Sequence, residues 1–138
     1  MTSSGATVPL PRPSALSQPF WDACKRGELM VQRCDDCRTY VFIPQVACTR
    51  CFSPKLVWVP SSGRGTVYSF TIVHRPQQPA FPVPYVVAIV EMEEGWYTLT
   101  NIVGCDPEAV RIGLPVAVEF REMSDTITLP LFHPADAR

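Results

Sequence analysis

Long hydrophobic runs are missing from this sequence of 138 residues. A helix that crosses a bilayer needs about 20 consecutive apolar residues, and no stretch here approaches that length. The opening segment, residues 1–18, has neither a basic start nor an apolar block, so we expect no secretory signal there. These absences predict a cytoplasmic protein, in which reducing conditions disfavour structural disulfides.

Histidine and glycine-rich loops are also scarce, and there is no excess of positive charge. The chain has 2 histidines, no glycine-rich phosphate loop and a net charge of -1, which gives no general attraction to nucleic acid or anionic membranes. A catalyst needs converging acid, base or nucleophile candidates. His74 and His133 have no recognisable partners, so we interpret both as structural. The sequence therefore offers little catalytic chemistry.

One nucleophile candidate remains, Cys105, which precedes Asp106 and Pro107. Asp106 is a good cap and Pro107 a good first residue for a single helical turn. A helix start beside a thiol can lower its pKa and activate it. A small apolar filler is the alternative reading of Cys105 and the one that we prefer.

Four of the 6 cysteines form two pairs with the spacing Cys-x2-Cys-x10-Cys-x2-Cys: Cys34, Cys37, Cys48 and Cys51. Each pair can direct two sulfurs at one ion, and two pairs complete a tetrahedron, so we predict a structural Zn²⁺ with no open position for water. Iron in the same shell, a redox dithiol or buried thiols are the alternatives. Knuckles of this kind often place glycine after the second cysteine.

Arg38 and Phe52 stand at those two positions, which predicts some local strain or a shifted turn. The sixth cysteine, Cys24, falls in a short segment between Ser17 and Gly27 that has helix start and stop signals. Phe20 and Cys24 are four residues apart and share one face of that helix, so Cys24 is expected to pack rather than react.

The chain divides into three parts. The 46% hydrophobic and 18% charged residues are typical of a folded protein. Residues 1–18 are rich in Ser, Thr and Pro and predict a flexible arm. Residues 19–60 predict a short helix plus a zinc ribbon, and residues 61–138 a β-barrel.

The barrel prediction comes from alternating apolar and β-branched residues. Strands are expected at 66–73, 85–90, 96–103, 116–121 and 127–131, with the helical turn between the third and fourth. The run 85–90 is continuously apolar, which indicates burial on both faces. The fold class is therefore all-β, with a short N-terminal helix and zinc ribbon before a five-stranded OB-type barrel.

A proline-rich loop joins the first two barrel strands. Residues 75–85 contain four prolines, which stiffen the backbone, and they include Phe81 and Tyr85. OB-type barrels commonly bind ligands near this connection. A stiff loop loses little entropy when it meets an apolar surface, so it is a candidate binding element; an inert connector is the alternative.

Several motifs together resemble one protein family. They are Phe20-Trp21, Gly27–Leu29, Gln32–Cys34 with the cysteine pairs, Val73–Pro76, Pro84–Ala88, Leu99–Cys105 and Val110–Val116. In this order they are similar to the acyl-CoA-associated OB-fold proteins with a rubredoxin-like zinc ribbon, the family of domain of unknown function thirty-five. The similarity covers residues 19–132.

The resemblance implies a non-catalytic subunit of thiolase-superfamily enzymes: thiolases, acyltransferases or lipid-transfer-protein-like aldolases that shorten steroid side chains. Such subunits help to shape the acyl-CoA channel, which makes acyl-CoA a shared ligand. By motif, Arg75, Pro76, Tyr85 and Asn101 are implied to face the ligand or partner, and Phe81 joins them from the loop argument. A nucleic-acid-binding module is one alternative, and a self-sufficient enzyme that uses Cys105 or a redox cysteine pair is another.

Overall fold

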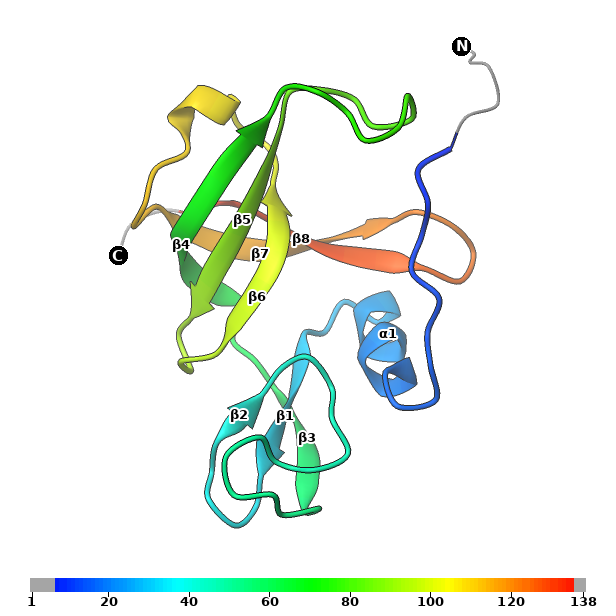
Figure 1. Cartoon of the computed structure of the whole chain (residues 1–138), viewed down its shortest axis with the longest axis vertical. Coiled ribbons are helices and arrows are strands. Elements are labelled where there is room, and N and C mark those ends of the chain that lie inside the picture. Colours follow the sequence, from blue (N-terminus) through cyan, green and yellow to red (C-terminus); the bar gives the residue numbers. More distant parts are fainter. Residues whose placement is uncertain (1–6, 136–138) are drawn as a thin grey trace.

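The computed structural model describes residues 7–135. A helix and a small sheet lie at one end, and a barrel lies at the other (Figure 1). In chain order the elements are α1 Gln18–Lys25, β1 Met30–Cys34, β2 Tyr40–Val41, β3 Leu56–Pro60, β4 Arg64–Val73, β5 Tyr85–Met92, β6 Tyr97–Ile102, the 3-10 turn η1 Pro107–Ala109, β7 Pro115–Glu122 and β8 Thr128–Pro134.

Helix α1 forms where its start and stop signals predicted it. Ser17 is the N-cap, proline occupies the first turn, and Gly27 has a φ of 78° just after the helix. Phe20 and Cys24 share the buried face, with 6% and 0% exposure, as the four-residue spacing indicated. Among the residues described, no helix has the length and hydropathy to span a bilayer.

The ribbon is a three-stranded antiparallel sheet in the order β2-β1-β3. Strand β1 pairs with β3 over five residues, from Met30↔Pro60 to Cys34↔Leu56, and with β2 at two. The first cysteine therefore sits at the end of the central strand, beside the turns that carry the other three.

The remaining strands close into a barrel in the order β4-β5-β6-β8-β7, with η1 between β6 and β7. Asp106 caps η1 by accepting a hydrogen bond from the Glu108 N–H at 2.9 Å. Strand β4 pairs with both β5 and β7 near Gly65, where a Cβ would collide with the Glu91 carbonyl oxygen and come within 2.8 Å of a Val90 methyl group. This arrangement is the predicted OB-type topology.

The helix, ribbon and barrel share one apolar core. Phe20, Leu29 and Val31 from the N-terminal half cluster with buried barrel residues such as Met92 and Phe132. An aromatic chain crosses the junction: the Phe20 and Phe42 ring centroids are 5.4 Å apart, and those of Phe42 and Trp96 are 4.9 Å apart. The ribbon is therefore packed on the barrel by side chains.

One expectation about the barrel was wrong. Strand β5 is not buried on both faces: Val86, Ala88 and Val90 point into the core, whereas Tyr85, Val87 and Ile89 are only partly buried. The continuous apolar run concealed an ordinary two-residue alternation. Its outward side chains leave an apolar strip on the barrel surface.

Candidate metal centre and loop pocket

The four paired cysteines meet in space. Their Sγ atoms all lie within 4.8 Å of one another. Cys34 and Cys51 are 3.6 Å apart, and Cys37 and Cys48 are 3.5 Å apart. A tetrahedral zinc with Zn–S bonds of about 2.3 Å requires sulfurs about 3.8 Å apart, whereas disulfide sulfurs lie only about 2.05 Å apart. The geometry therefore fits a metal-binding site.

The two knuckles share the same backbone geometry. The Arg38 N–H donates to the Cys34 carbonyl at 2.9 Å, and the Phe52 N–H donates to the Cys48 carbonyl at 3.0 Å. Both residues have positive φ, 69° for Arg38 and 66° for Phe52. The strain predicted at these two positions, where glycine is common, is therefore present in both turns.

Backbone N–H groups contact the cysteine sulfurs, and neighbouring groups shift the pKa values of the thiols. The N–H groups of Arg50 and Cys51 point at the Cys48 Sγ, at 3.3 and 3.5 Å. The Thr39 hydroxyl beside Cys37 lowers the pKa of that thiol to about 6. The Ser53 N–H acts to lower the pKa of Cys51. Desolvation and the three nearby sulfurs have a larger effect in the opposite direction, and they raise this pKa to about 12.

Four thiolates this close need a cation between them, because neighbouring sulfurs oppose the loss of the last proton. Sulfur would fill all four positions of a tetrahedral shell, so a zinc ion held here stabilises the fold and leaves no site for a reacting water. The donor set matches the prediction of a structural site.

A second site lies at the other end of the barrel. Phe81, Tyr85 and Asn101 line one cavity of about 250 Å³, although the loop and β6 are distant in the sequence. The Phe81 and Tyr85 rings stack with centroids 6.0 Å apart, and the Tyr85 hydroxyl donates to Gln77 at 2.7 Å. The Asn101 amide donates to the Val86 carbonyl at 2.8 Å. The loop and the strand thus form a fixed wall.

The other two residues singled out by motif, Arg75 and Pro76, lie elsewhere. Both are exposed just after β4, outside the lining of this cavity. The structure therefore brings together three of the five and leaves two on the open surface.

Sequence reasoning missed the opposite wall of the cavity. That wall comes from Val8 of the N-terminal arm and from Arg121, Met123, Leu129 and Leu131 of β7, β8 and their hairpin. No motif marked these residues, because their role depends on the barrel closing and on the arm crossing the hairpin. Arg121 is the one charged residue in the lining that the structure describes.

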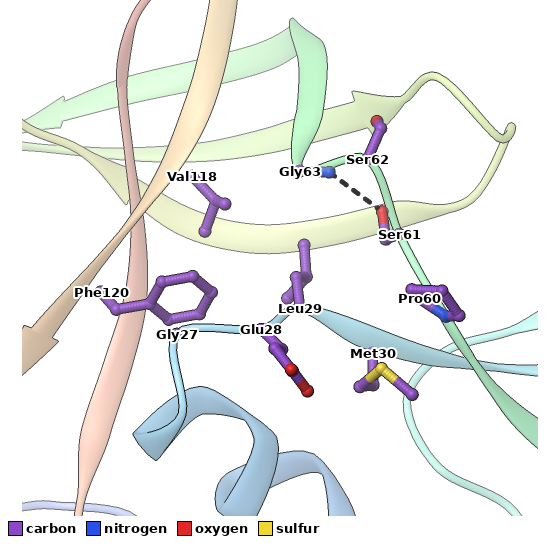
Figure 2. A pocket seen from close by; sticks show the side chains of 10 residues that line it. All are labelled: Gly27, Glu28, Leu29, Met30, Pro60, Ser61, Ser62, Gly63, Val118 and Phe120. Carbon is purple, nitrogen blue, oxygen red and sulfur yellow. Dashed lines mark hydrogen bonds between the residues drawn. The ribbon is translucent and has the colours of Figure 1, made fainter.

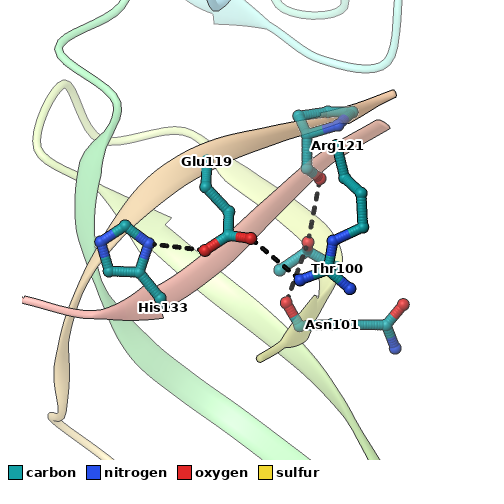
Figure 3. A network of polar contacts seen from close by, with 6 residues as sticks. Thr100, Asn101, Glu119, Arg121 and His133 are labelled. Atoms are coloured by element: carbon teal, nitrogen blue, oxygen red, sulfur yellow. Dashed lines mark hydrogen bonds and ion pairs between the residues drawn. The ribbon is translucent and has the colours of Figure 1, made fainter. Parts of the chain in front are cut away.

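Arg121 is held by a polar network on β7 and β8 (Figure 3). Glu119 pairs with Arg121 at 3.0 Å and with the His133 Nδ1 at 3.0 Å. His133, which had no recognisable partner in the sequence, is therefore a cross-strand neighbour of an acidic residue. His74 is exposed just after β4. The network keeps Arg121 beside the cavity.

The cysteines outside the metal centre are poor nucleophiles. Burial raises the pKa of Cys24 to about 12. Desolvation and the Asp106 carboxylate raise the pKa of Cys105, which opposes formation of the thiolate. The reading of Cys105 as a filler is favoured over its reading as an activated thiol.

A second cavity, of about 460 Å³, lies at the junction of ribbon and barrel (Figure 2). Its polar groups are already paired: the Ser61 hydroxyl donates to Glu94 at 2.9 Å and accepts from the Gly63 N–H at 3.3 Å. Glu94 also accepts from the Ser62 N–H and the Trp96 indole. Partial burial opposes ionisation of Glu94, but these donors outweigh it and lower its pKa. This cavity is better explained as a junction than as a ligand site.

Comparison with known proteins agrees with this geometry. Residues 21–57 match the ChsH2 rubredoxin-like zinc ribbon domain, and residues 58–121 match the ChsH2 C-terminal OB-fold domain. A DUF35 domain-containing scaffold protein of Methanothermobacter thermautotrophicus is 34% identical over 103 residues, which cover 73% of this chain and 77% of the relative. This chain belongs to the DUF35 family.

Other proteins similar to this chain are named as subunits. The 3-oxo-4,17-pregnadiene-20-carboxyl-CoA hydratase alpha subunit of Mycobacterium tuberculosis is 42% identical over 106 residues, or 77% of this chain. The benzoylsuccinyl-CoA thiolase subunit BbsA of Geobacter metallireducens is 34% identical over 82 residues, or 55% of each chain. The chain spans only 34–40% of the hydratase alpha subunits that it matches.

A solved structure titled "Ltp2-ChsH2(DUF35) aldolase" superposes with a TM-score of 0.83 and 38% identity, covering 91% of this chain and 98% of the matched chain. The family resemblance and the all-β fold with its N-terminal ribbon are therefore confirmed. The four clustered cysteines, inside a domain described as a zinc ribbon, support structural zinc.

Proposed function

We propose that this chain is a non-catalytic, cytoplasmic subunit that binds a thiolase-superfamily enzyme and helps to form its acyl-CoA site. The relatives named as a scaffold, a thiolase subunit and part of an aldolase support a role in a complex. The reaction of the complex would be the cleavage or formation of a carbon–carbon bond in an acyl-CoA.

The observation that carries the proposal is the loop pocket. Residues from the proline-rich loop, β6 and the β7–β8 hairpin converge on one cavity, and most of its lining is apolar. An acyl group is uncharged and apolar, so it would be desolvated there at little cost. Asn101 and Arg121 are the lining groups that could meet a polar part of the ligand.

The stiffness of the loop favours a binding role. Four prolines fall within residues 75–85, and the Phe81–Tyr85 stack and the Tyr85–Gln77 hydrogen bond hold the loop against itself. A preorganised loop loses little conformational entropy when a partner covers it. Arg75 and Pro76, exposed at the base of the same loop, are proposed to contact the enzyme rather than the cavity.

The chemistry of bond making would come from the partner. The raised pKa of Cys105 opposes its use as a nucleophile, and the paired cysteines form a closed sulfur set. What this chain would contribute is a wall of the acyl site and a surface that orients the enzyme.

Affinity purification of the tagged chain from its native cells, with identification of the captured protein by mass spectrometry, tests the proposal. We expect a thiolase-superfamily enzyme. Phe81→Asp would place a charge in the cavity and should abolish both capture and acyl-CoA turnover, with the thermal stability of the barrel unchanged.

Val83→Asp is the matched control, because Val83 lies in the same loop at 39% exposure but outside the cavity lining. It should keep the complex. If Phe81→Asp retained a fully active complex, the loop pocket would have no part in the function.

A further inference from the structure

Strand β6 has one paired edge and one open edge. It pairs with β5 along its whole length, in six register pairs from Glu91↔Tyr97 to Val86↔Ile102. On its other side, within residues 7–135, it pairs with β8 at Ile102↔Phe132 alone. In Figure 1, β6 extends from this contact toward the ribbon, whereas β8 extends sideways toward the turn that joins it to β7, so the two strands diverge.

The direction of the free backbone groups follows from the two-residue period of a strand. The Val103 N–H donates to the Phe132 carbonyl at 2.8 Å, so it points toward β8. Leu99 and Tyr97 are four and six residues earlier, and their N–H and C=O groups therefore point to the same side. In the described part of the chain, no register pair joins β8 to β6 at Tyr97 or Leu99, and nearby the Thr100 hydroxyl donates to the Pro130 carbonyl at 3.3 Å.

A groove of about 310 Å³ runs beside this open edge. One wall is Thr98–Asn101 of β6, and the other is Leu129–Phe132 of β8, with aromatic residues of α1 and the ribbon completing the lining. None of the lining residues is charged. Leu99 and Ile43, at its rim, are 70% and 64% exposed.

The edge also lacks the usual protection. An exposed row of backbone donors and acceptors can pair with another chain. Most sheet edges therefore either carry charges or prolines or are covered by another part of the protein. Residues 97–102 contain neither a charge nor a proline. An open, apolar and unprotected edge is typical of a strand that is covered in the functional assembly.

We infer that the open edge of β6 pairs with an extended, uncharged segment of the enzyme partner, which adds a strand in the groove between β6 and β8. The segment would receive hydrogen bonds from Leu99 and Tyr97 and place apolar side chains, two residues apart, over the groove. A charged segment is excluded because its charge would be desolvated with no counter-charge in the lining. This inference rests on the proposed function.

The groove lies next to the loop pocket. Asn101, Leu129 and Leu131 line both. A partner strand laid along β6 would therefore end beside the cavity proposed for the acyl group. That position would deliver residues of the enzyme to the same site.

Backbone hydrogen exchange of the isolated full-length chain is the first test. The amides of Tyr97 and Leu99 should exchange at least about tenfold faster than those of Thr98 and Thr100, which face β5. If Tyr97 and Leu99 were already protected in the isolated chain, or if they were protected by self-association in a concentration-dependent manner, the inference would be overturned.

The second test uses the complex with the captured, identified enzyme. Binding should slow exchange at Tyr97 and Leu99. Leu99→Pro, which removes the outward N–H without touching the ladder to β5, should weaken binding about tenfold more than Leu99→Ala does. An active complex in which these amides stay fast, or in which the two variants bind equally, would overturn the strand pairing while the proposed function stands. If no enzyme were captured, both the strand pairing and the proposed function would be contradicted.

Discussion

The ribbon and the barrel are stabilised in different ways. The barrel buries residues such as Val67, Val90 and Phe132 to 1% exposure or less in a continuous apolar core. The outer ribbon has only Cys34, Val41 and Cys48 as its buried cluster. A core that small cannot offset the entropy of ordering the turns around it, so a metal must hold those turns together. The fold therefore depends on metal at one end and on packing at the other.

The largest effect is expected from the metal ligands. Cys37→Ser removes one of the four sulfurs, so the ribbon should release its metal. Binding of structural zinc is worth on the order of 10 kcal/mol, and without this stabilisation the ribbon should lose its structure. Elemental analysis and amide exchange would measure this, with Cys105→Ser as the control that keeps the metal. Full metal content in Cys37→Ser would show that the four cysteines are not the site.

A substitution that creates a cavity in the barrel core should lower the stability of the fold without releasing the metal. Phe132 is 1% exposed, and Phe132→Ala should lower the free energy of unfolding by about 3–5 kcal/mol in a urea titration. The metal content should stay unchanged. Thr71→Ala, at an exposed position of β4, should change stability by no more than about 0.5 kcal/mol. Loss of metal from folded Phe132→Ala would contradict the conclusion that metal stabilises the ribbon and packing stabilises the barrel independently.

The junction between the regions should respond to pH through Glu94. Its folded pKa lies below the ordinary value of 4.5, so its carboxylate stabilises the fold above pH 4.5, and this contribution disappears as the pH falls through the lower folded value. Glu94→Gln should cost about 1 kcal/mol at neutral pH and remove that part of the acid sensitivity. Urea titrations of both proteins between pH 3 and 7 measure the difference. If their stabilities changed with pH in parallel, Glu94 would not contribute to the acid sensitivity of the fold.

The smallest effect is expected at the strained knuckles. Phe52 has a φ of 66° and is 78% exposed, so Phe52→Gly relieves backbone strain with little loss of packing. It should raise ribbon stability by about 0.5–1 kcal/mol, measured as resistance to a chelator. Val46→Gly, at 77% exposure and without a positive φ, should bring no gain. Equal behaviour of the two variants would mean that the strain at Phe52 is negligible.

Local patterns accounted for much of the fold. The cysteine spacing predicted the metal centre because two residues between cysteines fix the turn, whatever the rest of the chain does. The capped turn at Asp106 and the strands around it followed from short-range signals in the same way. Phe81, Tyr85 and Asn101 were named from the loop and the family motifs, and the structure places them around one cavity.

Features set by long-range geometry could not be predicted. The arm residue Val8 and the hairpin residue Met123 reach the loop pocket only because the chain folds back across the barrel. The divergence of β6 from β8 has no signature in either strand alone. The apolar run 85–90 misled for a related reason: a strand with apolar side chains on both faces has the same composition whether or not its outer face is covered.

Reconstitution of acyl-CoA turnover is the sharpest test of the proposal that this chain is a non-catalytic subunit that completes the acyl-CoA site of an enzyme. The purified chain, the captured enzyme and their mixture would be assayed for carbon–carbon bond cleavage with a panel of acyl-CoA substrates. We expect no turnover by the chain alone, weak turnover by the enzyme alone and full turnover by the mixture. Turnover by the zinc-loaded chain without any partner, or an enzyme indifferent to its presence, would contradict it.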